Sequence, residues 1–132
     1  MSKNFRLKWF SIFMMISGVA TCIIALLFPE TLSLFYLLSP NMTIEGLTNN
    51  GLNSIRFFAT LAGTMLTAWG LMGYHISFNY SFESRKVLLI AFVFWFIMDN
   101  LISFISGFPY NIILNIGFFA GGIWSLSIPV EN

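Results

Sequence analysis

The sequence predicts an all-α fold, a polytopic membrane protein built as an antiparallel bundle of four transmembrane helices in a single domain. Of its 132 residues, 58% are hydrophobic and only 8% are charged, whereas a soluble domain carries about 25% charged residues. Four apolar stretches reach the roughly 20 residues needed to cross a hydrocarbon core about 30 Å thick. Short links separate most of them, which favours antiparallel neighbours. The stretches are residues 9–28, 55–78, 87–106 and 111–128.

Helix-breaking and capping residues mark the boundaries of these stretches. The first is predicted to be a retained helix, because its apolar run exceeds the 7–15 residues typical of a signal-peptide core. Pro29 ends it, and Asn53 or Ser54 is available to cap the second helix. A tight turn at residues 107–109 separates the third and fourth helices, and Pro129 closes the last.

The basic residues predict the orientation in the membrane. Lys3, Arg6 and Lys8 precede the first helix, and Arg85 and Lys86 lie between the second and third. The links on the other side, including the external loop 29–54, carry no Lys or Arg. The positive-inside rule then places both termini in the cytoplasm, in a cell (inner) membrane. In the external loop, residues 31–38 are apolar but too short to span. A short interfacial helix and an extended loop over the bundle mouth are both compatible with them.

Asp99 lies in the middle of an apolar run. A carboxylate in such a place is expected to have either a hydrogen-bonding or ionic partner or a functional role. The predicted topology puts Asp99 in the outer half of the membrane with Arg56, which enters the second helix from the same side. Asp99 and Ser103, like Asn111 and Asn115, are four residues apart and therefore share a helix face. Because a charge at mid-membrane costs roughly 2.5–3.5 kcal/mol on insertion scales, we expect these five residues to converge.

This polar cluster has two interpretations. It can be a structural staple, in which Arg56 donates to the Asp99 carboxylate and fixes the helices in register. It can also be the floor of a small pocket that opens outward, with Asp99 as the ligand-facing or titrating group, because intramembrane charges are functional candidates by default.

Small residues indicate where helices pack closely in lipid. In the second predicted helix they recur every three or four residues on one face, at Ala59, Gly63, Thr67 and Gly70. The fourth helix has a GxxxG pair, Gly117 and Gly121. Whether that pair packs within the chain or between two copies is left open by the sequence.

Several functional classes find no support in the residues. Cys22 is the only cysteine and His75 the only histidine, so we expect neither an internal disulfide nor a metal site. The motifs of hydrolases, metalloproteases and phosphate-binding loops are absent, and the six basic residues form no stripe for nucleic acid. We therefore expect a non-enzymatic protein without a cofactor.

Two segments resemble a known group of proteins. Residues 51–71 read GLNSIRFFATLAGTMLTAWGL, and a later pattern, W-F-x-x-D-x-x-x-S, places Trp95, Asp99 and Ser103 before Gly107, Asn111 and Asn115. Together they resemble small four-helix bacterial membrane proteins of the biphenyl-operon (BphX-like) type, over residues 29–129. The resemblance implies Arg56, Asp99, Asn111 and Asn115 as the polar positions of the group and implies no activity.

The function predicted from the sequence is that of a non-enzymatic binding or accessory protein of the lipid bilayer. Its partner is expected to be a small hydrophobic ligand or another membrane protein, held by the outer polar cluster. The alternative is a subunit of an oligomeric small transporter or channel that uses Asp99 as the titrating or ion-facing group.

Overall fold

The computed structural model describes residues 4–28, 31 and 49–130 of the chain. Within these ranges the chain forms four α-helices and no strand. The helices are α1 (Phe5–Leu27), α2 (Asn49–Phe78), α3 (Phe82–Ile105) and α4 (Asn111–Ser125). The prediction of an all-helical protein is therefore confirmed.

Three of the helices are long and apolar enough to cross a membrane. They are α1, the Gly51–Phe78 part of α2, and α3, with 23, 28 and 24 residues. Helix α4 is also apolar but has only 15 residues, about 22 Å at 1.5 Å per residue. It ends at Ser125, three residues before the predicted end, where the Leu126 backbone N–H donates to the carbonyls of Gly122 and Ile123.

Helices α1, α2 and α3 begin earlier than the sequence predicts, and capping residues upstream of the apolar runs extend α1 and α3, whereas α4 begins at Asn111 as predicted. Asn4 caps α1, since its Oδ1 accepts from the Leu7 backbone N–H at 2.9 Å. Ser81 and Ser84 form a reciprocal capping box at the start of α3. The expected cap of the second helix at Asn53 or Ser54 is wrong, because α2 already begins at Asn49. The interfacial helix expected at residues 31–38 lies outside the described residues, apart from Thr31.

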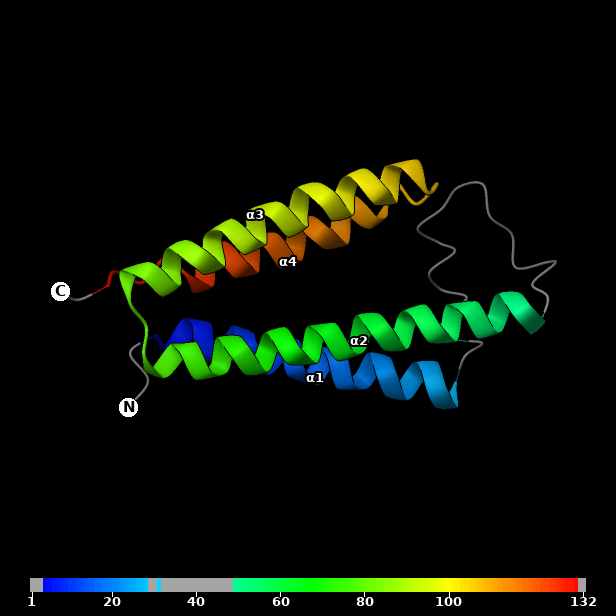
Figure 1. Cartoon of the computed structure of the whole chain (residues 1–132), viewed down its shortest axis with the longest axis horizontal. Helices are drawn as coiled ribbons and strands as arrows, with labels where there is room; N and C mark the ends of the chain where they lie inside the picture. Colours follow the sequence, from blue (N-terminus) through cyan, green and yellow to red (C-terminus); the bar gives the residue numbers. More distant parts are fainter. Residues whose placement is uncertain (1–3, 29–30, 32–48, 131–132) are drawn as a thin grey trace.

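The four helices are arranged as two hairpins. Helix α1 packs along α2, and α4 along α3 (Figure 1). The hairpins meet at the end that carries Asn4, Phe78, Phe82 and Ser125, which we call the closed end. They diverge toward the opposite end, where α1 and α3 finish and α2 and α4 begin, which we call the open end (Figure 1).

The α1–α2 hairpin is held by close approach of the two backbones. A Cβ atom added to Gly63 would lie 2.6 Å from both the Cys22 Sγ and the Gly18 carbonyl oxygen. One added to Gly70 would lie 2.7 Å from the carbonyl oxygen of Ser11. The small residues of α2 thus face α1 at a separation that no larger side chain permits. Small residues serve this purpose in helix pairs within lipid, where burial from water supplies no driving force.

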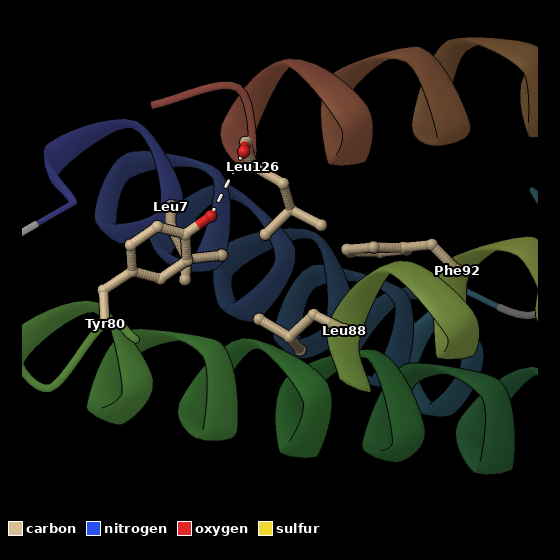
Figure 2. Packing of buried hydrophobic residues seen from close by; sticks show 5 residues of the cluster. All are labelled: Leu7, Tyr80, Leu88, Phe92 and Leu126. Carbon is tan, nitrogen blue, oxygen red and sulfur yellow. Dashed lines mark hydrogen bonds between the residues drawn. The ribbon is translucent and has the colours of Figure 1, made fainter. Parts of the chain in front are cut away.

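The closed end contains the apolar core. Leu7, Tyr80, Leu88, Phe92 and Leu126 come from α1, α3 and the segments that follow α2 and α4, and they pack together there (Figure 2). The Tyr80 hydroxyl, at the edge of this core, donates to the Leu126 carbonyl at 3.1 Å. The core therefore joins the two hairpins.

Asn4 reinforces this junction with hydrogen bonds. Its side chain is fully buried, and its Nδ2 donates to the Ser125 carbonyl at 2.9 Å. Its backbone N–H donates to the Ser77 carbonyl at 3.1 Å. One residue thus links the start of α1 to the last turns of α2 and α4. Since a buried amide that loses its partners costs about 1–3 kcal/mol, Asn4 helps to set the meeting point of the hairpins.

Candidate functional site

The candidate site is a group of polar side chains between α3 and α4, in the open half of the molecule. Asp99 of α3 accepts two hydrogen bonds on the same oxygen, Oδ2. The Asn115 amide donates to it at 2.5 Å and the Asn111 amide at 3.2 Å. Asn111 also donates to the Ser103 hydroxyl at 2.8 Å. The structure thus brings Asp99, Ser103, Asn111 and Asn115 together, and Asn115 and Ser103 are buried.

Local geometry explains how two helices build this group. Asp99 and Ser103 lie one turn apart on α3, and Asn111 and Asn115 lie one turn apart on α4. The link between the helices is short because Gly107 takes a φ of +82°, a left-handed conformation that favours glycine. The Phe108 backbone N–H then donates back to the Ser103 carbonyl at 2.8 Å. This turn places the two polar faces opposite each other.

The sequence analysis missed one member of the group, Asn100. Its Oδ1 accepts from the Asn115 amide at 2.8 Å. Asn100 follows Asp99 directly, so the two side chains lie about 100° apart around α3 and both reach the seam with α4. The signal was present as a second polar residue in an apolar run, but the four-residue spacing rule selects only residues on one face.

Several oxygen atoms of this group have unused capacity to accept hydrogen bonds. Each of the two α4 asparagines uses its amide nitrogen for two donations. The amide oxygens of Asn111 and Asn115, and Oδ1 of Asp99, accept no hydrogen bond from any side chain in the described ranges. Asp99 and Asn111 are partly exposed and Asn115 is buried, so the group is reachable at Asp99 and Asn111. A carboxylate beside free carbonyl oxygens suits a ligand that brings several N–H donors.

The structure does not bring Arg56 to this group. No ion pair joins its guanidinium to Asp99 in the part of the chain that the structure describes. Arg56 instead donates through Nη1 to Asn53, one turn earlier in α2, at 3.4 Å. Its Nε is buried and has no hydrogen-bond partner there. The contact was predicted because Arg56 and Asp99 lie in the same half of the membrane, whereas α2 and α3 diverge toward this end (Figure 1).

The residues predicted to pack helices fall into two groups. In α2, Gly63, Thr67 and Gly70 lie against α1, whose Gly18 and Ser11 complete that interface. In α4, Gly121 lies against the Phe10 ring of α1, but a Cβ at Gly117 would meet nothing within 4 Å. Ala59 is half-buried in α2. The sequence analysis missed Gly18, which lies on α1 without a second glycine to mark a stripe.

The remaining reactive side chains lie apart from one another. The Cys22 thiol donates to the Thr60 carbonyl at 3.5 Å within the α1–α2 hairpin. His75 is exposed near the closed end of α2. Within the described ranges, no three His, Cys, Asp or Glu side chains are grouped as a metal ion requires.

Comparisons of the chain with protein-family models, with curated proteins and with solved structures give no match. The resemblance to BphX-like proteins therefore stays a prediction.

Proposed function

We propose that the protein is a multi-pass protein of the inner membrane, with four spans and both termini in the cytoplasm. The three long apolar helices support membrane insertion. Helix α4 is paired with α3 along its length (Figure 1), and its exposed Ile113, Leu114, Ile116 and Trp124 suit contact with lipid. The charged residues of the described helices, Arg56 and Asp99 excepted, lie at the closed end. This distribution suits a cytoplasmic closed end.

Asp99, Asn100, Ser103, Asn111 and Asn115 together are called the Asp99 group. We further propose that the Asp99 group binds a cation, either an ammonium on a small amphipathic molecule or a basic side chain of a membrane partner. The observation that carries this proposal is that the hydrogen-bond partners of Asp99, which are Asn111 and Asn115, are neutral. An unpaired charge in a low-dielectric environment is costly. Residues 29–48, between α1 and α2, contain no Lys, Arg or His that could supply the counter-charge. A bound cation would remove that cost.

Thermal unfolding of dilute purified protein in dodecyl maltoside micelles tests this site. Dodecylammonium is the probe, because it combines an apolar chain with an ammonium group. Near 100 times its Kd, a ligand adds about 2.7 kcal/mol to the free energy of unfolding, so we expect the midpoint to rise by several degrees. Asp99→Asn keeps the side-chain shape and should lose this response.

A matched control is Glu83→Gln, which removes an exposed carboxylate at the closed end and should respond as the wild type does. An equal response of wild type and Asp99→Asn would contradict the proposal. Proton flux through reconstituted vesicles that Asp99→Asn abolishes, without any dodecylammonium response, would instead support the transporter alternative.

A further inference from the structure

The two ionic groups nearest the open end lie on different hairpins. Asp99 is on α3 and Arg56 is on α2, while every other charged residue of the described helices is at the closed end. Counted from the closed end at 1.5 Å per residue, Asp99 lies about 26 Å along α3 and Arg56 about 33 Å along α2. The levels of the two opposite charges therefore differ by about 7 Å.

The Asp99 group offers hydrogen-bond acceptors and a negative charge, and Arg56 offers donors and a positive charge. The Asp99 group has unused acceptor oxygens and no cation from the described residues. Arg56 has a buried Nε without a partner and one long hydrogen bond to a neutral amide. A guanidinium presents its donors as a planar fork that matches a carboxylate. The divergence of the hairpins keeps the two groups of one chain from meeting (Figure 1).

Acyl chains can cover the apolar side chains near the open end but cannot satisfy these charges. Acyl chains are as apolar as leucine, so the exposed Phe57, Phe58 and Phe104 do not by themselves require a protein partner. The two charges do need an oppositely charged or polar partner. Unpaired charge, rather than exposed apolar area, therefore identifies the partner.

We propose that a second copy of this chain supplies the missing groups, with Arg56 of each copy donating to Asp99 of the other. A two-fold axis along the membrane normal makes such contacts reciprocal, so one interface forms two ion pairs at the same depth. The amide oxygen of the partly exposed Asn111, which donates to Asp99 through its nitrogen, can accept a remaining guanidinium N–H group. The inference deepens the proposed function, because it names the cation that occupies the Asp99 group.

The test uses two charge-reversed variants of the full chain, Arg56→Glu and Asp99→Arg. Alone, each places like charges together in both pairs of its homodimer. Mixed, the two variants regain opposite charges in both pairs. We measure energy transfer between donor- and acceptor-labelled chains in liposomes of phosphatidylethanolamine and phosphatidylglycerol. We expect transfer for the wild type, at least a tenfold weaker association of each variant alone, and recovery in the mixture.

The mixture separates pairing between chains from pairing within one chain. An ion pair inside a chain predicts that the double variant recovers while the mixture does not, and that result would overturn the proposal. Lys86→Glu, a charge reversal at the closed end, is the matched control and should associate as the wild type does.

A measurement on the unaltered protein keeps the proposal testable if a variant fails to fold. Native mass spectrometry of the wild type should detect dimers, and dodecylammonium should shift them toward monomers. Wild type that stays monomeric at every concentration overturns the dimer. If such monomers still gain thermal stability from dodecylammonium, the proposed cation site stands without the dimer. If association recovers in the mixture but dodecylammonium has no effect, the proposal of a small-molecule ligand is wrong and the proposal of a dimer stands.

Discussion

Asp99 illustrates how a charged side chain is accommodated in an apolar helix without a counter-charge from its own hairpin. Two amide groups converge on one carboxylate oxygen, and hydrogen bonds to a charged acceptor are worth about 1.5–3 kcal/mol each. These bonds offset part of the desolvation cost but bring no positive charge. Asp99 is thus positioned firmly while its charge remains available to a cation.

Tyr80, in the link between α2 and α3, behaves in the opposite way, because its environment favours the neutral form. Burial raises the pKa of the Tyr80 hydroxyl, and the nearby Arg85 and a hydrogen bond with Asn4 offset this only in part. The neutral hydroxyl is also the form that donates to the Leu126 carbonyl. The closed end therefore depends on a protonated tyrosine.

This shift predicts a loss of stability in alkali. The folded pKa of Tyr80 lies above the unfolded value of about 10. Its contribution is therefore complete below about pH 10 and is lost as the pH rises through the folded pKa. Tyr80→Phe should cost about 0.5–1.5 kcal/mol at neutral pH, the net worth of one hydrogen bond. Thermal melts from pH 7 to 11 should show a shallower alkaline decline for Tyr80→Phe than for the wild type; parallel declines would contradict this.

At the scale of the helices, composition and length were enough to predict their number and type, but not the starts of α1, α2 and α3 or the end of α4. The apolar runs were found by hydropathy, whereas the caps Asn4 and Ser81 extend α1 and α3 into polar sequence, and α2 already starts in polar sequence at Asn49. Capping competes with turn formation in the same residues, so the sequence pattern alone does not decide between them. The α2 stripe of small residues was readable because its spacing follows the helical period.

The two glycine-containing faces give a matched pair for testing helix packing. Gly63→Ala puts a methyl group against the Gly18 carbonyl and Cys22, and overpacking of this kind costs about 1–3 kcal/mol. Gly117→Ala meets open space and removes a glycine from a helix, which favours folding by up to about 1 kcal/mol. Unfolding midpoints in micelles should therefore move in opposite directions. A similar loss in both variants would show that backbone flexibility, rather than close packing, determines the result.

For the whole molecule, the sequence predicted which residues are polar and on which face, but not how the helix pairs sit relative to each other. Asp99, Ser103, Asn111 and Asn115 meet because a short turn joins their helices, and such local contacts follow from spacing. The expected contact with Arg56 depended on the angle between two hairpins. That angle is set at the closed end, about 26 Å from Asp99 along α3, by Asn4 and the core around Leu7.

The arrangement of the hairpins predicts different distances at the two ends. Spin labels on exposed residues of α2 and α3 report these distances when attached to cysteines in a Cys22→Ser chain. Phe57→Cys with Phe104→Cys probes the open end, and His75→Cys with Val87→Cys probes the closed end. Because the core and Asn4 fix only the closed end, we expect a narrow distribution there and a longer, broader one at the open end. Labelled chains diluted with unlabelled protein exclude distances between copies. Short, narrow distributions at both ends would mean that the helices close into a parallel-sided bundle, in which Arg56 can reach Asp99 of its own chain.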